Sequence, residues 1–174
     1  MTDLRYPIGK FDWNSEFTPA QVKEAIKIIE LAPAALRKAI EGLSPQQLET
    51  NYRPGGWTVR QVVNHVPDSH LNAYIRCKLA VTEEKPTIRP YYEDRWAELQ
   101  DGRNGKIETS LDLLENLHSR WVIFLRSLSD ADYNKSYVHP DIGELKLGTT
   151  IADYSWHGRH HTAQITSLRE RMGW

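Results

Sequence analysis

The chain has 174 residues, the size of one domain that can bury a hydrophobic core. Its 22 basic and 23 acidic residues nearly cancel, which argues against the basic patch of a nucleic-acid-binding protein and against electrostatic binding to a membrane. No apolar run is long enough to span a bilayer, and the N-terminus lacks a signal-peptide core. The single cysteine, Cys77, cannot form an internal disulfide, so we expect a cytoplasmic protein in which Cys77 is a small core residue.

Helix-start signals recur in the first half of the chain. Thr18-Pro19-Ala20-Gln21 reads as an N-cap, a first-turn proline and a capping-box glutamine, and the helix that it opens is expected to end near Gly42. Ser44-Pro45-Gln46-Gln47 opens a second, short helix by the same rule. Thr58-Val59-Arg60-Gln61 predicts the start of a long helix that runs to about Thr82.

The second half is less regular. Residues Glu83 to Lys106 are rich in proline, charge and aromatic side chains, which indicates an ordered connection or lid whose aromatic residues anchor the loop or line a pocket. An amphipathic helix is predicted from Ile107 to Leu128. Residues Lys135 to Leu147 favour a small hairpin or extended excursion. Thr150-Ile151-Ala152-Asp153 is expected to cap the final helix, which ends at Met172-Gly173.

These elements predict an all-α fold. Four substantial helices, each with one apolar face, indicate a four-helix bundle. Without a repeat, a low-complexity tract or a shift in composition, residues 1–174 are expected to form a single domain. The long connections allow parallel neighbours, so an up-down-up-down order is not assumed.

The most informative motif is Trp156-His157-Gly158-Arg159-His160-His161. His157 and His161 are four positions apart, which on an α-helix places both imidazoles on one face, where they can hold the same metal ion. A helical wheel sets His161 inside the apolar stripe and His157 at its edge, whereas His160 is predicted to face solvent or to lie behind the ligands. The alternative is an accidental pair on a solvated helix face.

A third ligand must come from elsewhere in the chain. The wheel favours His70, which lies on the apolar stripe of its helix, whereas His65 lies on a polar edge of the kind that walls an open cleft. Pro67 removes a helical amide between them, and the wheel is least dependable beside such a residue. Spacing therefore leaves His65 and His70 as alternatives. The full set of candidates comprises His65, His70, His118 and His139.

Two segments carry a family resemblance. Asn64–His70 and Tyr154–Ala163, with Tyr6–Gly9 and the Arg53–Thr58 turn, resemble the DinB-like superfamily, and more closely the YfiT-type bacillary proteins described as metal-dependent hydrolases. The resemblance implies a four-helix bundle in which three histidines hold one divalent metal and solvent completes its coordination. Matched motif to motif, those ligands fall on His65, His157 and His161.

Three neutral imidazoles leave a metal ion with an open coordination position, which is typical of catalytic rather than structural zinc. Zinc is the expected metal, and nickel suits the same ligands. The predicted function is hydrolysis of a small-molecule substrate by metal-activated water. The open position could instead bind a thiolate, and the resemblance also implies this first alternative, transfer of a low-molecular-weight thiol such as bacillithiol. The second alternative is metal-dependent binding or sensing without catalysis. The resemblance further implies a homodimer.

No catalytic residue beyond the metal ligands is assigned from the sequence. Asp153 lies one turn before His157 and could accept a hydrogen bond from its distal N–H, but capping of the helix is the favoured interpretation. Asp68, three residues after His65, is a candidate base or a solvated helix residue.

Overall fold

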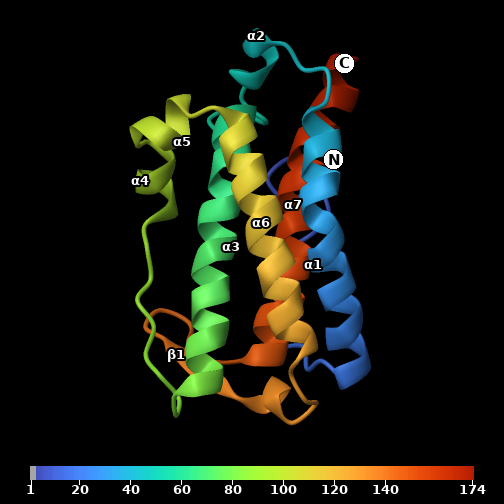
Figure 1. The fold of residues 1–174 in the computed structure, drawn as a ribbon. Helices are drawn as coiled ribbons and strands as arrows, with labels where there is room; N and C mark the ends of the chain where they lie inside the picture. Colours follow the sequence, from blue (N-terminus) through green and yellow to red (C-terminus); the bar gives the residue numbers. More distant parts are fainter. Residues whose placement is uncertain (1–2) are drawn as a thin grey trace.

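Four long helices form the body of the protein, whose computed structural model describes residues 3–174 (Figure 1). They pack side by side as the predicted four-helix bundle. The helices are α1 (Pro19–Ile40), α3 (Val59–Thr82), α6 (Ile107–Arg126) and α7 (Leu147–Met172).

Shorter elements fill the connections. Four of them are short helices, namely α2 (Pro45–Leu48), α4 (Glu93–Ala97), α5 (Gln100–Asn104) and the 3-10 helix η1 (Asp132–Asn134). The expected hairpin is present as the antiparallel pair β1 (Ser136–His139) and β2 (Gly143–Lys146). In its register Ser136 lies opposite Lys146 and His139 lies opposite Gly143.

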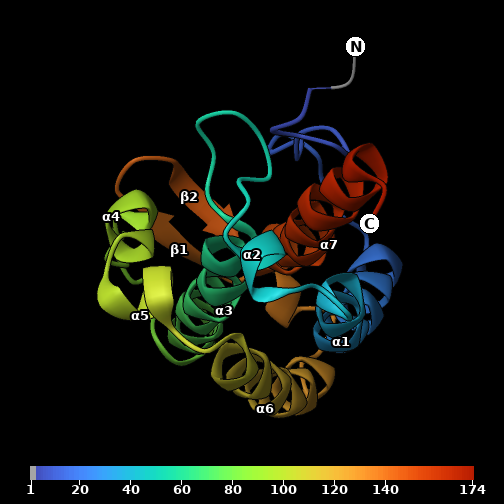
Figure 2. The same cartoon turned by 90° about the horizontal axis from the view of Figure 1, so that it is seen from above.

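The order of helix directions is not up-down-up-down. Around the bundle axis α1 contacts α6 and α7, and α3 contacts the same two helices (Figure 2). In Figure 1, α1 and α7 run upward, whereas α3 and α6 run downward. The contacting helices α1 and α7 are therefore parallel to each other, and so are α3 and α6. A parallel neighbour needs a connection that travels the length of the bundle, and the Glu83–Lys106 segment with α4 and α5 makes that return between α3 and α6.

The predicted capping boxes are present at three helix starts. In each, the N-cap hydroxyl accepts from the backbone N–H three residues later, and the glutamine there accepts from the N-cap N–H. After α1 the chain turns through Gly42, whose φ of +76° favours glycine. The boxes are formed by Thr18 with Gln21, Ser44 with Gln47, and Thr58 with Gln61.

The predicted start of the last helix is wrong. α7 begins at Leu147 with Lys146 as its N-cap, three residues before Thr150. Lys146 provides no side-chain cap, so the helix has no start signal in its sequence, and it follows β2 without a loop. Thr150 is buried within the first turn, where its hydroxyl lies 3.1 Å from the Tyr137 hydroxyl.

The core divides into two main clusters along the bundle. Trp121 and Cys77 lie in one cluster, and Cys77 is fully buried, which raises its thiol pKa to about 12 and agrees with the predicted core role. On α7, Tyr154 belongs to this cluster and Ile165 to the other. The histidine motif therefore lies between the two apolar clusters.

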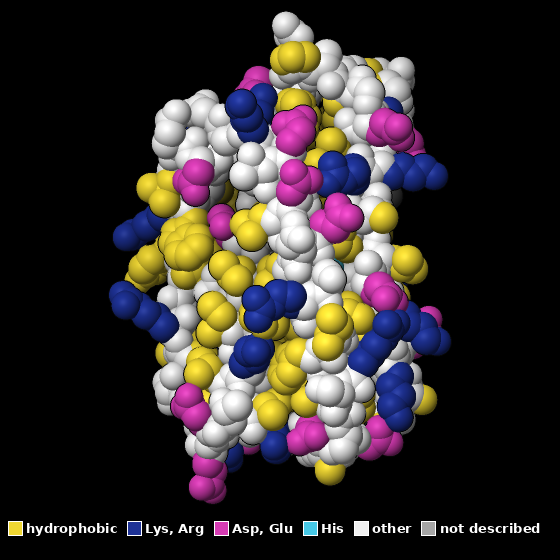
Figure 3. Space-filling model, in the orientation of Figure 1, with side chains coloured by type: hydrophobic (Ala, Val, Ile, Leu, Met, Phe, Trp, Pro, Cys, Tyr) yellow, Lys and Arg dark blue, Asp and Glu magenta, His cyan; other side chains and the backbone are white. Residues whose placement is uncertain are grey.

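The surface agrees with the balanced charge. On the face shown in Figure 3, Lys and Arg side chains alternate with Asp and Glu side chains, and neither sign gathers into a patch. Within residues 3–174 no helix combines the length and hydropathy that a bilayer crossing requires.

Candidate metal centre

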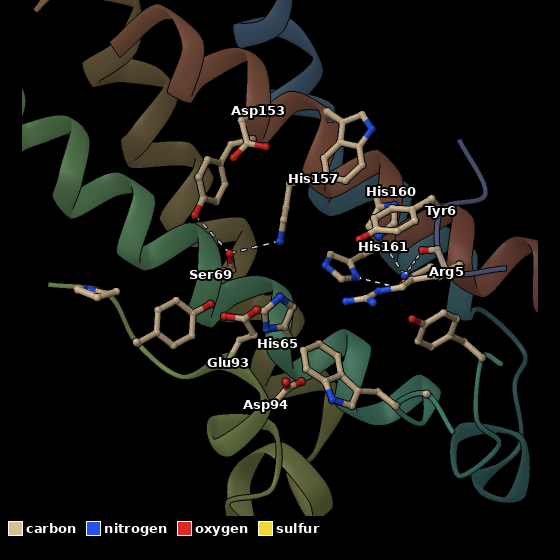
Figure 4. Close-up of a pocket in the computed structure, with 18 of the residues that line it drawn as sticks. Arg5, Tyr6, His65, Ser69, Glu93, Asp94, Asp153, His157, His160 and His161 are labelled. Carbon is tan, nitrogen blue, oxygen red and sulfur yellow. Dashed lines mark hydrogen bonds between the residues drawn. The ribbon is translucent and has the colours of Figure 1, made fainter. Parts of the chain in front are cut away.

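Three histidines converge between α3 and α7 (Figure 4). His65 comes from α3, whereas His157 and His161 come from consecutive turns of α7. One nitrogen from each ring lies within 4.8 Å of the others. The structure thus brings together the three residues that the family resemblance implied, and it does so across a helix–helix contact that spacing alone could not resolve.

Helix geometry explains how α7 presents its two imidazoles. His157 and His161 are one turn apart, and their ring centroids are 4.5 Å apart. Between them, Gly158 lies against α1, where an added Cβ would stand 3.2 Å from the Ala32 Cβ and 3.6 Å from His70 Cε1. The glycine therefore permits the close approach of α7 to α1 and leaves room for the His70 ring.

Burial keeps the three imidazoles neutral. His65 and His161 are each only 7% exposed. Burial lowers the pKa of His65 to about 4 and holds the pKa of His157 and His161 well below the usual value. Neutral imidazole is the form that donates a lone pair to a metal ion, so the site is ready to bind at neutral pH.

Hydrogen bonds engage the distal nitrogens of the α7 pair. His161 Nδ1 lies 2.9 Å from Gln164 Oε1, and His157 Nδ1 lies 3.1 Å from His70 Nε2. Both contacts leave Nε2 as the atom available to a ligand. His70, which the helical wheel favoured as third ligand, instead lies behind His157 and contacts its far nitrogen.

Of the two predicted positions of His160, facing solvent is wrong and lying behind the ligands is confirmed, because its side chain is only 5% exposed and shares Gln164 with His161. It stacks on Trp156 with ring centroids 4.5 Å apart, and the Tyr6 ring lies 5.6 Å away. The Gln164 amide nitrogen lies 3.0 Å from both His160 Nε2 and the Arg5 carbonyl oxygen. The wheel treats a helix alone and could not show that the N-terminal segment covers this face.

The remaining histidine candidates lie outside the cluster. His118 is buried in the core on α6, where its Nδ1 lies 2.6 Å from the Ile29 carbonyl oxygen. His139 ends β1 and lines the cavity described below, and its Nδ1 accepts a hydrogen bond of 3.2 Å from the Asp141 N–H.

The favoured capping interpretation of Asp153 is also wrong. The helix begins at Leu147, so Asp153 lies beyond the first turn and is 8% exposed. Burial raises its pKa to about 7, an effect that the Arg76 cation partly opposes. Asp153 also does not orient His157, whose Nδ1 contacts His70. Asp68, half-buried on α3, has a pKa raised to about 6 by burial and is not among the cavity residues.

A cavity of about 690 Å³ opens above the histidine cluster. Ser69 lies beside the cluster, with its hydroxyl 3.3 Å from both His157 Nε2 and the Tyr154 hydroxyl. Tyr91 lines the cavity, so that one loop aromatic takes the pocket-lining role rather than only anchoring the loop. The wall also contains Arg76, whose Nε is buried without a hydrogen-bond partner among residues 3–174.

The donor set fits a divalent transition-metal ion. Three imidazole nitrogens suit zinc, nickel, copper and iron alike. In the described part of the chain the cluster consists of these three donors, so a bound cation would keep a position for solvent or substrate. Such an arrangement is characteristic of catalytic sites.

Comparisons with known proteins agree with this description. The sequence pattern of the DinB superfamily matches residues 28–165. A Bacillus cereus (strain AH820) protein named a putative metal-dependent hydrolase is 55% identical over 174 residues, which is 100% of both chains. The solved structure of YfiT from Bacillus subtilis, described as a probable metal-dependent hydrolase with an unusual four-helix bundle topology, is 46% identical, covers 98% of each chain and has a TM-score of 0.95. The four-helix bundle protein TT2238, at 20% identity and a TM-score of 0.55, covers 88% of this chain and 99% of its own and shares the fold.

Proposed function

The chain belongs to the DinB superfamily, and we propose that it is a metal-dependent hydrolase in which His65, His157 and His161 hold one divalent cation. The observation that carries the proposal is the approach of three neutral imidazole nitrogens to within 4.8 Å of one another beside a cavity. The names of the relatives support the same class of activity. Zinc is the proposed metal because it accepts such a donor set and keeps an open position, and nickel is the second choice.

When bound, the cation supplies Lewis acidity that makes water a usable nucleophile near neutral pH. The protein must then accept a proton and hold the substrate. Asp153 is the proposed proton acceptor, because it lines the cavity and its pKa of about 7 lets it exchange protons at neutral pH. Ser69 and Tyr154 present hydroxyl groups next to His157 and are placed to orient the reacting groups.

The size of the cavity supports a small-molecule substrate. Its volume of about 690 Å³ is in the range of small-molecule sites rather than of a groove for a polymer. The Nε of Arg76 is a buried donor without a hydrogen-bond partner among residues 3–174, and Arg76 lines the cavity, so a substrate oxygen that carries negative charge is the proposed partner. Asp141 and Ile142 lie in the turn between β1 and β2. They line the same cavity and add one polar and one apolar side chain to its wall.

Elemental analysis of protein purified without a histidine tag tests the metal site. We expect nearly one divalent metal ion per chain, which His65→Ala, His157→Ala and His161→Ala each remove. His139→Ala is the matched control, because this buried histidine lines the cavity outside the cluster. Retention of metal by His65→Ala together with its loss from His70→Ala would show that the third ligand is misassigned.

Turnover assays then test the reaction. Metal-loaded protein is supplied with chromogenic esters and amides in the absence of thiol, and in parallel with monochlorobimane with and without bacillithiol. The hydrolase proposal expects turnover without thiol and a strong loss of that turnover in Asp153→Asn, since a general base contributes about 100- to 10,000-fold. Turnover that requires the thiol would refute hydrolysis and identify a thiol S-transferase, and binding without turnover would identify a sensor.

A further inference from the structure

A row of histidines runs from the cavity into the core, and all four long helices contribute to it. His157 Nδ1 on α7 lies 3.1 Å from His70 Nε2 on α3. His70 Nδ1 lies 2.8 Å from His118 Nε2 on α6, and His118 Nδ1 lies 2.6 Å from the Ile29 carbonyl oxygen on α1. His70 and His118 are 0% and 2% exposed, so bulk water cannot substitute for any of these contacts.

The row begins at a carbonyl that a proline releases. In an α-helix the Ile29 carbonyl would accept from the N–H of residue 33, but residue 33 is Pro33, which has no N–H. A buried carbonyl without a partner is unfavourable, and the His118 Nδ1–H supplies the missing donor. The proline inside α1 thereby creates a specific acceptor for a side chain on α6.

The carbonyl sets the direction of every hydrogen bond in the row. Because a carbonyl oxygen only accepts, His118 must carry its proton on Nδ1. A neutral imidazole has one N–H, so His118 Nε2 accepts from His70 Nδ1–H, and His70 Nε2 accepts from His157 Nδ1–H. Burial lowers the pKa of His118 to about 4 and that of His70 well below the usual value, which agrees with neutral rings.

We propose that His70 and His118 are positioning residues that, anchored on the Ile29 carbonyl, hold His157 in the Nδ1–H tautomer with its Nε2 lone pair directed to the metal centre. The inference rests on the proposed metal site. An N–H···N hydrogen bond at the far nitrogen fixes the orientation of a ligand ring and raises its basicity. The row therefore strengthens metal binding from the middle of the core.

Two contacts around the cluster agree with this direction. The Ser69 hydroxyl, 3.3 Å from His157 Nε2, can donate to a bare nitrogen there. His161 shows the same tautomer by a separate route, since its Nδ1 faces Gln164 Oε1 at 2.9 Å while the Gln164 amide nitrogen faces the Arg5 carbonyl oxygen. Both α7 ligands are thus held by their Nδ1 atoms and offer Nε2 to the centre.

The first test reads the tautomers directly. Long-range ¹H–¹⁵N correlation spectra of the metal-free full-length protein distinguish Nδ1–H from Nε2–H imidazoles. We expect Nδ1–H for His118, His70 and His157 in the wild type, and a mixture of tautomers at His157 in His118→Phe, which fills the ring volume without nitrogen. An Nε2–H His157 in the wild type, or an unchanged His157 in His118→Phe, would overturn the proposal.

The second test measures metal affinity by competition with a chromophoric zinc chelator. Loss of such a supporting contact weakens binding by about 10- to 100-fold, which is the expected effect of His118→Phe and His70→Leu. His70→Gln should recover part of the affinity, because its amide oxygen can accept from His157 Nδ1–H. Wild-type affinity in His70→Leu would contradict the positioning role.

Matched controls separate positioning from general damage to the core. Leu125→Ala truncates a fully buried side chain on α6, two turns from His118, and should lower stability while the metal affinity stays the same. His139→Phe removes a buried histidine outside the row and should also keep the affinity. A wild type with the expected tautomers but no metal binding would refute the proposed metal site and uphold the direction of the row.

Discussion

Asp153→Asn is predicted to reduce the loss of stability that accompanies a rise in pH from about 4 to 7. The pKa of Asp153 rises from 3.8 to about 7 on burial, so between these values the folded protein keeps a proton that the unfolded chain has lost. The free energy of unfolding must then fall as pH rises through this window. Each pH unit is worth about 1.4 kcal/mol for one proton, which makes the full cost about 4 kcal/mol as an upper bound.

The test compares two pH values, because any constant effect of the asparagine cancels in the difference. Urea unfolding of the metal-free protein at pH 5 and pH 7 gives the free energy of unfolding by linear extrapolation. Relative to wild type, the free energy of unfolding of Asp153→Asn should gain about 2 kcal/mol between pH 5 and pH 7, because the native carboxyl is already half ionised at pH 7. Asp141→Asn is the control, since its carboxylate lies at the same cavity with a side chain that is 75% exposed.

If Asp153→Asn changed the free energy of unfolding by the same amount at pH 5 and at pH 7, the carboxyl of the folded wild type would have to be ionised throughout this range. That result would also remove the basis for Asp153 as a proton acceptor with a pKa near neutrality. The predicted gain together with lost turnover would instead show that the protein keeps this carboxyl for activity at a cost in stability.

Gly158→Ala should destabilise the protein by up to about 2 kcal/mol in thermal unfolding, since its Cβ would lie 3.2 Å from that of Ala32, and Ala32→Gly should restore part of the loss. Arg76→Met should raise the pKa of Asp153 further, because the cation lowers it, and a pH–rate profile that does not shift would exclude this coupling. Acid should destabilise the metal-free protein between pH 6.5 and 4. The free energy of unfolding should fall by about 1.4 kcal/mol per pH unit for each buried neutral histidine, because the unfolded chain takes up a proton that the folded protein does not. A midpoint of urea unfolding that stays constant over this range would contradict the prediction. The histidines with a pKa lowered to about 4 are His65, His118 and His160.

Local signals predicted most helix boundaries. Each capping box depends on residues within one turn, such as Thr18 and Gln21, and therefore can be found without knowledge of the tertiary structure. The start of α7 at Leu147 escaped prediction because Lys146 provides no side-chain cap. Thr150 and Asp153 resemble a helix start but lie inside the helix, where they serve packing and the cavity.

The candidate site was only partly accessible from the sequence. The i,i+4 spacing of His157 and His161 predicts a shared helix face, and the structure places both at the cluster. Spacing could not choose between His65 and His70, and the wheel favoured the residue that lies behind the cluster. A helical wheel describes one helix, whereas the choice depends on how α3 crosses α7.

By itself the sequence determined where most helices begin and which of their faces are apolar. It also determined that two histidines lie on the same face of one helix, in consecutive turns. These properties arise from contacts within a few residues. The tertiary structure decided which third histidine meets them, which segment buries His160, and what accepts the His118 proton. The acceptor, Ile29, lies 89 positions away from His118. Contacts of that separation depend on helix crossings that no short-range pattern encodes.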